Sequence, residues 1–329
     1  MKSVFLGDQH NTDYVYAPDV LAAFEQEAGL VSRRIFTPDS GDIPSDVDFI
    51  FSTWGMPALT EETIARVFPN LKAVFYAAGT VQGFARPFLA KGVRVFCAAA
   101  ANAVPVAEYT LAQILLANNN YFTSAKLFSE YKLAESREVA EAMHGNYRPK
   151  IGLLGAGMIG KLVIGLLKHH DMDICVFDPF LSDEEAGRLG VKKASLDEIF
   201  SACNVVSNHL ANNAQTVGML TRPLFESMRP YATFINTGRG AQIVEADLCA
   251  VLKSRSDITA LLDVTDPEPS PEGHPFYTLP NVFLTPHIAG SKGKEVHRMS
   301  EYMLRDFRRF QSNEPCLYEV TEDMLATMA

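Results

Sequence analysis

Three polar residues, each placed just after a short apolar run, have side chains suited to acid–base chemistry on a carboxylate-bearing compound. They are Arg239, Glu268 and His287. A guanidinium can bind a carboxylate through two parallel hydrogen bonds. An imidazole titrates near neutral pH and can donate a proton, and a neighbouring carboxylate would orient the ring and favour its charged form. Because the carboxyl ends of parallel strands meet at the ligand-binding edge of an open α/β sheet, we expect the three residues to converge there.

A glycine-rich turn gives a second chemical signal. Residues 155–160 read Gly-Ala-Gly-Met-Ile-Gly, directly after the apolar run 151–154, and apolar residues then repeat at helical spacing. This order predicts a strand, a tight turn and a helix whose free N–H groups would meet a pyrophosphate. Asp178 ends the next predicted strand, roughly 20 residues further on, where a carboxylate would bind the adenosine ribose. No Arg or Lys follows it closely, which favours NAD over NADP. The cofactor residues predicted from this segment are Gly155, Gly157, Met158, Ile159, Gly160 and Asp178.

Each of these residues also has an ordinary structural explanation. Arg239 could form a surface ion pair, Glu268 could be a solvated loop charge, and His287 could cap the helix that follows. The glycine turn and Asp178 could serve packing alone. Because polar residues at successive strand ends follow a complete cofactor fingerprint, we favour the functional interpretation. His209, at the end of another predicted strand, could equally be structural or lie near the cofactor.

Two series of strand-like runs alternate with helical patterns, which predicts parallel α/β sheets. The strand-like runs are residues 4–6, 47–52, 71–76 and 93–97 in the first series, and 151–154, 173–177, 204–207, 233–236, 258–263 and 282–284 in the second. One long helix is predicted over residues 104–131, as the bridge between two domains. Another is predicted over residues 293–310, beyond the last strand, so the chain could return to the first domain.

The composition excludes several classes of protein. The 329 residues are 47% hydrophobic and 21% charged, with a net charge of −10, which is typical of a globular protein without a basic surface for nucleic acid or anionic lipid. The five cysteines are odd in number and include no CxxC pair, which argues against disulfides and a thiolate metal site, so no metal is expected. The apolar start is too short for a signal peptide, and no segment is long enough for a membrane helix. We therefore expect a cytoplasmic protein.

Together, these motifs resemble the D-isomer-specific 2-hydroxyacid dehydrogenase family over most of the chain. The segments that carry the resemblance are the glycine turn 155–160, Asn-Thr-Gly-Arg-Gly at 236–240, the segment 263–269, Thr-Pro-His-Ile-Ala-Gly at 285–290 and residues 102–108. The resemblance implies an α/β chain in which a doubly wound Rossmann NAD-binding domain, residues 103–291, is inserted into a flavodoxin-like parallel α/β substrate domain. That substrate domain would comprise residues 1–102 and the return segment 292–329.

The resemblance also implies a reaction and further site residues. Hydride transfer from NADH would reduce a small 2-keto acid to its (R)-2-hydroxy acid, with His287 as the proton donor, Glu268 orienting His287, and Arg239 holding the substrate carboxylate. Further cofactor contacts are expected from His209, Thr237, Gly238, Arg239, Asp263 and His287. Substrate contacts are expected from Trp54, Ala78, Gly79, Arg239 and His287. A homodimer is expected to form through the region of the 104–131 helix.

The sequence departs from the family pattern at two places. Ala211 stands where a proline is usual, and the segment 77–81 keeps its glycine but lacks the aspartate that commonly follows. The loops 52–57 and 77–81 also lack Arg and Lys, so a phosphate would have no partner there, and we expect an unphosphorylated substrate. One alternative from another class stays open, a non-catalytic NAD(H)-responsive protein like the corepressors that share this fold.

Overall fold

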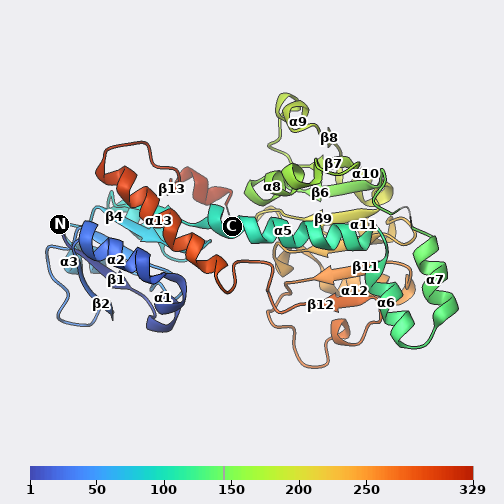
Figure 1. Ribbon diagram of the computed structural model, residues 1–329, viewed down its shortest axis with the longest axis horizontal. Helices are drawn as coiled ribbons and strands as arrows, with labels where there is room; N and C mark the ends of the chain where they lie inside the picture. Colours follow the sequence, from blue (N-terminus) through green and yellow to red (C-terminus); the bar gives the residue numbers. More distant parts are fainter. Residues whose placement is uncertain (144, 329) are drawn as a thin grey trace. The chain divides into compact units, whose positions relative to one another are not determined.

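The computed structural model describes residues 1–143 and 145–328 of the chain, which form two compact α/β units (Figure 1). Unit 1 comprises Met1–Asn102 and Ser291–Ala329, and unit 2 comprises Ala103–Gly290. This α/β architecture with two largely parallel sheets confirms the predicted fold class. Every helix in the described part of the chain is too short or too polar to span a bilayer.

Unit 1 is built on a six-stranded sheet in the order β13-β5-β4-β3-β1-β2, in which only β13 runs antiparallel to its neighbour. Its strands are β1 (Ser3–Leu6), β2 (Leu30–Phe36), β3 (Phe49–Ser52), β4 (Ala73–Tyr76), β5 (Arg94–Cys97) and β13 (Glu319–Val320). Its helices are α1 (Gln9–Val15), α2 (Pro18–Glu27), α3 (Glu61–Val67), α4 (Ala85–Ala90) and α13 (Glu295–Gln311). The order of the five parallel strands is that of flavodoxin-like sheets.

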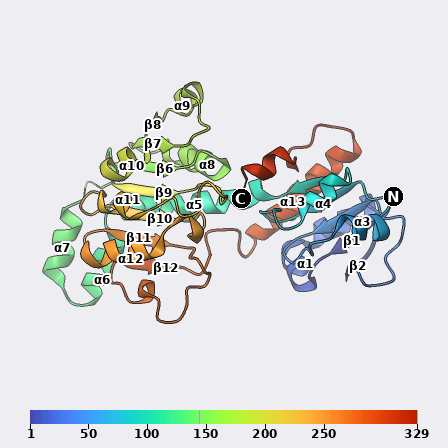
Figure 2. The same ribbon diagram turned by 180° about the vertical axis from the view of Figure 1, so that it is seen from behind.

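Aromatic side chains fill one face of this sheet, beneath α1, α2 and α13. Helices α3 and α4 cover the other face (Figure 2). Phe75 of β4 stacks on Phe96 of β5, with ring centroids 4.7 Å apart and planes only 8° apart. Phe307 of α13 packs edge-on against Phe51 and Phe75, with centroids 5.4 and 5.6 Å away. The helix predicted over residues 293–310 is therefore α13, and its apolar stripe completes the core of unit 1.

Unit 2 is built on a fully parallel, seven-stranded sheet in the order β12-β11-β10-β9-β6-β7-β8. Its strands are β6 (Lys150–Leu154), β7 (Asp173–Phe177), β8 (Lys192–Lys193), β9 (Val205–Asn208), β10 (Thr233–Asn236), β11 (Thr259–Leu262) and β12 (Val282–Leu284). The chain builds outward from β6 to β8, then crosses back and builds from β9 to β12. The doubly wound order thus reverses between β6 and β9, the position at which such sheets bind nucleotides.

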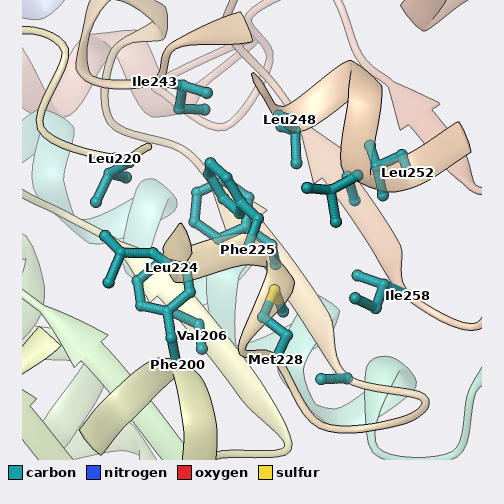
Figure 3. Close-up of a cluster of buried hydrophobic side chains, with 14 of the residues drawn as sticks. Phe200, Val206, Leu220, Leu224, Phe225, Met228, Ile243, Leu248, Leu252 and Ile258 are labelled. Atoms are coloured by element: carbon teal, nitrogen blue, oxygen red, sulfur yellow. The ribbon is translucent and has the colours of Figure 1, made fainter. Parts of the chain in front are cut away.

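Helices cover both faces of this second sheet. The helices that lie wholly or mostly in this unit are α5 (Ala99–Ala117), α6 (Tyr121–Ser129), α7 (Leu133–Glu141), α8 (Met158–Leu167), α9 (Asp183–Leu189), α10 (Leu196–Ala202), α11 (Arg222–Glu226) and α12 (Glu245–Ser254). Figure 3 shows the core beneath α10, α11 and α12, which includes Phe200, Phe225 and Leu248. The core of the opposite face includes Ile114 of α5 and Val163 of α8. Burial on both faces accounts for the continuous apolar runs of these strands.

The prediction of one helix over residues 104–131 is wrong, because α5 ends at Ala117 and α6 begins only at Tyr121. Between them lie three consecutive asparagines, and Asn120 adopts a left-handed conformation with a φ of 48°. Asparagine tolerates that conformation better than most residues, and its side chain competes with the helical backbone for hydrogen bonds. The predicted helix is therefore two helices with a turn between them, and only α5 crosses from unit 1 into unit 2.

Candidate active site

The glycine turn, residues 155–160, packs closely against the end of β9. Gly155 has a φ of 96°, and its N–H donates to the carbonyl of Phe177 at 2.7 Å. A Cβ at Gly155 would lie 2.8 Å from the carbonyl oxygen of His209, and one at Gly160 would lie 2.1 Å from that of Gly155. Only glycine fits at these two positions, so the turn, the start of α8 and the end of β9 pack against one another.

The middle glycine of the turn faces open space. Gly157 is the N-cap of α8, and a Cβ added to it would meet no atom within 4 Å. The hydrogen bond from Lys161 N–H to the Gly157 carbonyl, at 2.9 Å, starts the helix. Met158 and Ile159 therefore lie in the first turn, where N–H groups lack acceptors within the helix. Open space at a helix N-terminus suits a bound pyrophosphate, so these residues fit a dinucleotide.

Asp178 follows β7 and lies against the glycine turn. Its Oδ2 accepts a hydrogen bond from Ala156 N–H at 2.6 Å, and its Oδ1 accepts one from Phe180 N–H at 2.8 Å. These two bonds fix the carboxylate beside the turn, and each oxygen has further lone pairs with which it could accept from ribose hydroxyls.

His209 is buried at the end of β9, next to the glycine turn. Its Nε2 lies 2.9 Å from the hydroxyl of Ser207, whereas its Nδ1 is buried and has no hydrogen-bond partner among the described residues. Burial lowers the pKa of His209 to about 4, so the ring is neutral at neutral pH. Because buried polar atoms are nearly always paired, the free Nδ1 suits a contact with a polar group of a bound molecule.

The turn after β10 carries Arg239. The side chain of Asn236 holds this turn, since its Oδ1 accepts from Gly238 N–H and its Nδ2 donates to the Arg239 carbonyl, both at 3.0 Å. Arg239 Nη1 donates to the Gly238 carbonyl at 2.8 Å, which leaves further N–H donors of the guanidinium for a ligand. The Thr237 hydroxyl lies 3.3 Å from that of Thr110 in α5.

The turn that carries Arg239 packs directly on the loop that leads to Glu268. A Cβ at Gly240 would lie only 2.0 Å from the carbonyl carbon of Thr265, so the two backbones are in contact. The next residue, Asp266, donates its N–H to Glu245 Oε1 at 2.9 Å. Burial raises the pKa of Glu245. Glycine at 240 and the carboxylate of Glu245 thus fix the loop in which Glu268 lies.

His287 and Glu268 form a direct pair, with His287 Nδ1 at 2.6 Å from Glu268 Oε1. Both side chains are accessible, with 45% and 41% of their surfaces exposed. His287 has a φ of 51°, which is uncommon for a residue with a side chain, and its N–H donates to the Asp263 carbonyl at 3.0 Å. Since Nδ1 is engaged by Glu268, Nε2 is the ring nitrogen that is left for a substrate.

Asp263 anchors the loop that carries His287. Its buried carboxylate follows β11 and accepts three hydrogen bonds, from the Thr285 hydroxyl at 2.6 Å, Ile288 N–H at 2.8 Å and Ala289 N–H at 2.9 Å. The sequence suggested a cofactor contact for Asp263 and gave no sign of this structural task. The anchor explains how His287 is held in an uncommon backbone conformation.

The predicted substrate residues Trp54, Ala78 and Gly79 lie in unit 1, after β3 and β4. Trp54 is partly buried and packs against the cores on both faces of the sheet. Ala78 is fully buried, and its N–H donates to the Tyr76 carbonyl at 2.9 Å. Gly79 is partly exposed. The structure therefore gives Trp54 and Ala78 packing roles within unit 1, whereas Arg239, Glu268 and His287 all follow carboxyl ends of strands in unit 2.

Two buried amides at the same edge of unit 2 were missed by sequence reasoning, Asn208 at the end of β9 and Gln242 beyond Arg239. No motif or spacing marks them, because their contacts come from strands that are distant in the sequence. Within the described residues, no cluster of three or more His, Cys, Asp or Glu side chains is arranged to hold a metal ion.

Comparison with known proteins supports the arrangement of unit 2. Residues 111–289 match the family model described as D-isomer specific 2-hydroxyacid dehydrogenase, NAD binding domain. Glyoxylate/hydroxypyruvate reductase A of Yersinia enterocolitica is 32% identical over 193 residues, which cover 57% of this chain and 59% of that protein. D-3-phosphoglycerate dehydrogenase of Mycobacterium tuberculosis is 27% identical over 296 residues, which cover 89% of this chain and 51% of that protein.

The matches to curated relatives cover between 36% and 59% of the length of those proteins. Among solved structures, D-mandelate dehydrogenase of Rhodotorula graminis superposes with a TM-score of 0.81 at 21% identity, over 98% of this chain and 97% of that one, which shows a shared fold. The family model covers more than half of the chain, and the glycine turn that it includes fits a dinucleotide. The chain therefore belongs to the D-isomer specific 2-hydroxyacid dehydrogenase family and carries that family's NAD-binding domain.

Proposed function

We propose that this protein is a cytoplasmic NAD-dependent oxidoreductase that interconverts a small, unphosphorylated 2-keto acid and its (R)-2-hydroxy acid. The observation that carries the proposal is the pair of His287 and Glu268, 2.6 Å apart, at the same sheet edge as the Arg239 turn and the glycine turn. Bound NADH supplies the hydride. An acid–base pair, a carboxylate-binding group and a dinucleotide turn are together what the reduction of a 2-keto acid requires.

Each residue has one task in this reaction. The planar guanidinium of Arg239 binds the substrate carboxylate through two hydrogen bonds. The charged imidazole of His287 donates its Nε2 proton to the ketone oxygen as negative charge develops there. Glu268 accepts from Nδ1, which fixes the plane of the ring and directs Nε2 toward the substrate. In the reverse direction, neutral His287 takes the proton from the hydroxyl group.

The absence of cationic residues in two loops of unit 1 supports an unphosphorylated substrate. Residues 52–57 and 77–81 contain no Arg and no Lys. A phosphate dianion bound by these loops would lose its hydration without gaining a charged partner. This chain is similar both to a relative named glyoxylate/hydroxypyruvate reductase and to one named D-3-phosphoglycerate dehydrogenase. A comparison of phosphorylated with unphosphorylated substrates therefore distinguishes the two substrate classes.

A substrate panel tests the proposal. The loss of NADH absorbance is measured with glyoxylate, hydroxypyruvate, a branched 2-keto acid and 3-phosphohydroxypyruvate, and the configuration of the product is determined. We expect a higher kcat/KM for an unphosphorylated acid and an (R) product. A preference for the phosphorylated compound would contradict the substrate class. NADH binding without turnover of any 2-keto acid would favour a non-catalytic NAD(H)-responsive protein instead.

We also propose that the protein is a homodimer, on the basis of exposed aromatic residues near α6. Tyr121, Phe128 and Tyr131 have 52%, 61% and 84% of their surfaces exposed. Large apolar side chains grouped on a surface are typical of protein–protein interfaces. Sedimentation velocity at micromolar concentration should give the mass of two chains, and the mass of one chain would contradict the proposal.

A further inference from the structure

A cluster of buried amides lies beneath the proposed catalytic edge of unit 2. It consists of Asn208 at the end of β9, Asn236 at the end of β10, and Gln242 in the turn after Arg239, and all three side chains are fully buried. Asn208 Nδ2 donates to Asn236 Oδ1 at 3.0 Å and to Gln242 Oε1 at 2.5 Å. The cluster therefore ties the ends of two neighbouring strands to one side chain of the following turn.

The amide oxygen and the amide nitrogen of Gln242 form hydrogen bonds with the backbones of two different loops. Its Oε1 also lies 3.3 Å from Arg239 N–H, which donates to it. Its Nε2 donates to the carbonyls of Leu210 and Ala211, at 2.7 and 3.1 Å. One side chain thus connects the backbone of Arg239 with the loop that follows β9.

The loop that follows β9 is in turn in contact with the glycine turn, since the His209 carbonyl oxygen would lie 2.8 Å from a Cβ at Gly155. The loop's position therefore bears on the cofactor site, and the position of the Arg239 turn bears on the substrate site. A buried amide that loses its partners leaves unpaired donors and acceptors, so the spacing between these elements is defined as long as Gln242 remains.

We propose that Gln242 is a positioning residue, which sets the distance between the loop 209–211 on the cofactor side and the Arg239 turn on the substrate side. It touches neither cofactor nor substrate and acts through the backbone groups that it holds. The substrate part of this inference rests on the proposed function of Arg239. The cofactor part rests only on the NAD-binding domain, and it can be measured without any substrate.

The decisive variant is Gln242→Leu, which keeps the approximate volume of the side chain and removes its hydrogen bonds. We expect the Kd for NADH, measured from the fluorescence change of NADH on binding, to rise about tenfold. For the preferred 2-keto acid, kcat/KM should fall by about 10- to 100-fold, because small displacements of a positioned group are costly in rate.

Gln242→Glu provides the conservative comparison. Burial favours the neutral acid, whose carbonyl oxygen can accept as the amide oxygen does and whose single O–H can donate to one of the two carbonyls of the loop 209–211. At about pH 6, we expect this variant to bind NADH within about threefold of wild type. If Gln242→Glu binds NADH as weakly as Gln242→Leu at this pH, the hydrogen bonds to the two loops are not what matters, and the proposal is overturned.

Asn281→Ala is a matched control from the opposite, amino-terminal end of the same sheet. Asn281 is equally buried, and its Nδ2 donates to the carbonyls of Leu252, Arg255 and Ile258 at 3.1, 3.1 and 2.8 Å. We expect this variant to lower Tm at least as much as Gln242→Leu while leaving the Kd for NADH unchanged. An equal loss of NADH affinity in both variants would show a general effect of stability and refute the positioning role.

The outcomes for the two proposals are distinguishable. A wild-type protein that reduces no 2-keto acid refutes the proposed function, yet the NADH titrations still decide whether Gln242 holds the cofactor side. A wild-type protein that is active, with a Gln242→Leu variant that binds NADH and turns over substrate normally, refutes the role of Gln242 alone. If Gln242→Leu does not fold, Gln242→Glu decides, because a Kd raised by more than about tenfold in that variant contradicts the proposal.

Discussion

The carboxyl ends of the two sheets carry different side chains, although both units are α/β structures with largely parallel strands. In unit 2, β9 and β10 end in the buried amides of Asn208 and Asn236, and the buried carboxylate of Asp263 follows β11. Among the described residues of unit 1, no parallel strand ends in an amide or a carboxylate. These strands end in Leu6, Phe36, Ser52, Tyr76 and Cys97.

The two units therefore rely on different physical means. Burying an amide or a carboxylate is costly unless each polar atom is paired, and the three polar side chains of unit 2 are paired with the backbone of the turns above them or with one another. Unit 2 contains contacting buried rings as well, but in unit 1 such rings continue across β3, β4 and β5 and on to Phe307 of α13. Hydrogen bonds from buried polar side chains at the strand ends thus hold the turns of unit 2, whereas ring packing between the strands and α13 is the prominent feature of unit 1.

The largest expected effect is on catalysis by His287→Ala. Without its proton donor, the enzyme should lose about 10²- to 10⁴-fold in kcat, with little change in the Kd for NADH. Steady-state kinetics and NADH titration measure both quantities. His170→Ala, three residues beyond the end of α8 in the same unit, is the control and should keep full turnover. Near-normal turnover by His287→Ala would mean that the polar edge of unit 2 is not the catalytic one.

Asp178 is expected to determine the choice of cofactor. Wild type should strongly prefer NADH, because the carboxylate accepts from the ribose hydroxyls and repels a 2′-phosphate. Asp178→Ala should lower kcat/KM for NADH about 10- to 100-fold, since it removes acceptors from the ribose and from Ala156 N–H. Asp178→Asn keeps an acceptor oxygen for the turn and should chiefly relax the discrimination against NADPH. Equal use of NADH and NADPH by wild type would contradict the assignment.

Phe307→Leu tests whether the aromatic core of unit 1 affects stability without affecting cofactor binding in unit 2. Phe307 is fully buried and makes edge contacts with the rings of Phe49, Phe51 and Phe75. Losing these contacts should destabilise the protein by about 1.5 kcal/mol, measured by urea unfolding, and should leave the Kd for NADH unchanged. A substantial loss of NADH affinity would show that the aromatic core also controls the cofactor site.

A smaller effect is expected from His209 on stability as a function of pH. Burial lowers its pKa to about 4, below the value of about 6.5 in an unfolded chain, so the unfolded state takes up a proton first as the pH falls. The stability is therefore present above about pH 6.5 and lost toward about pH 4, with about 1 kcal/mol lost between about pH 7.5 and about pH 5.5. Urea unfolding at these pH values should show a smaller loss for His209→Gln, and identical losses would contradict a buried neutral ring.

The sequence allowed good predictions where a strand is a short, mainly apolar run. The predicted strands 173–177, 233–236 and 282–284 coincide with β7, β10 and β12, and each of these runs contains at most two polar residues. It failed for β2, an edge strand that contains the exposed residues Arg33 and Arg34. Polar residues at the exposed positions of β2 interrupt the run of apolar residues by which a parallel strand is recognised in a sequence.

The candidate site divides in the same way. The glycine turn and the residues that follow the strands were found because each belongs to a local motif. Gln242 and the anchoring role of Asp263 were not found, because their hydrogen bonds depend on the register of strands that lie far apart in the sequence. The break at Asn120 has a local cause, but helical periodicity on both sides of it concealed the change of direction.

Because the backbones of Gly240 and Thr265 are in contact, the turn that carries Arg239 and the loop that carries Glu268 cannot move independently of each other. Any side chain at position 240 would push the backbone of Thr265 away and carry Glu268 with it. Segments exchanged between relatives should therefore be taken as a pair, 237–242 together with 263–269. Attempts to broaden the range of substrates should begin elsewhere, in the loops of unit 1, where changes leave this coupled pair of segments intact.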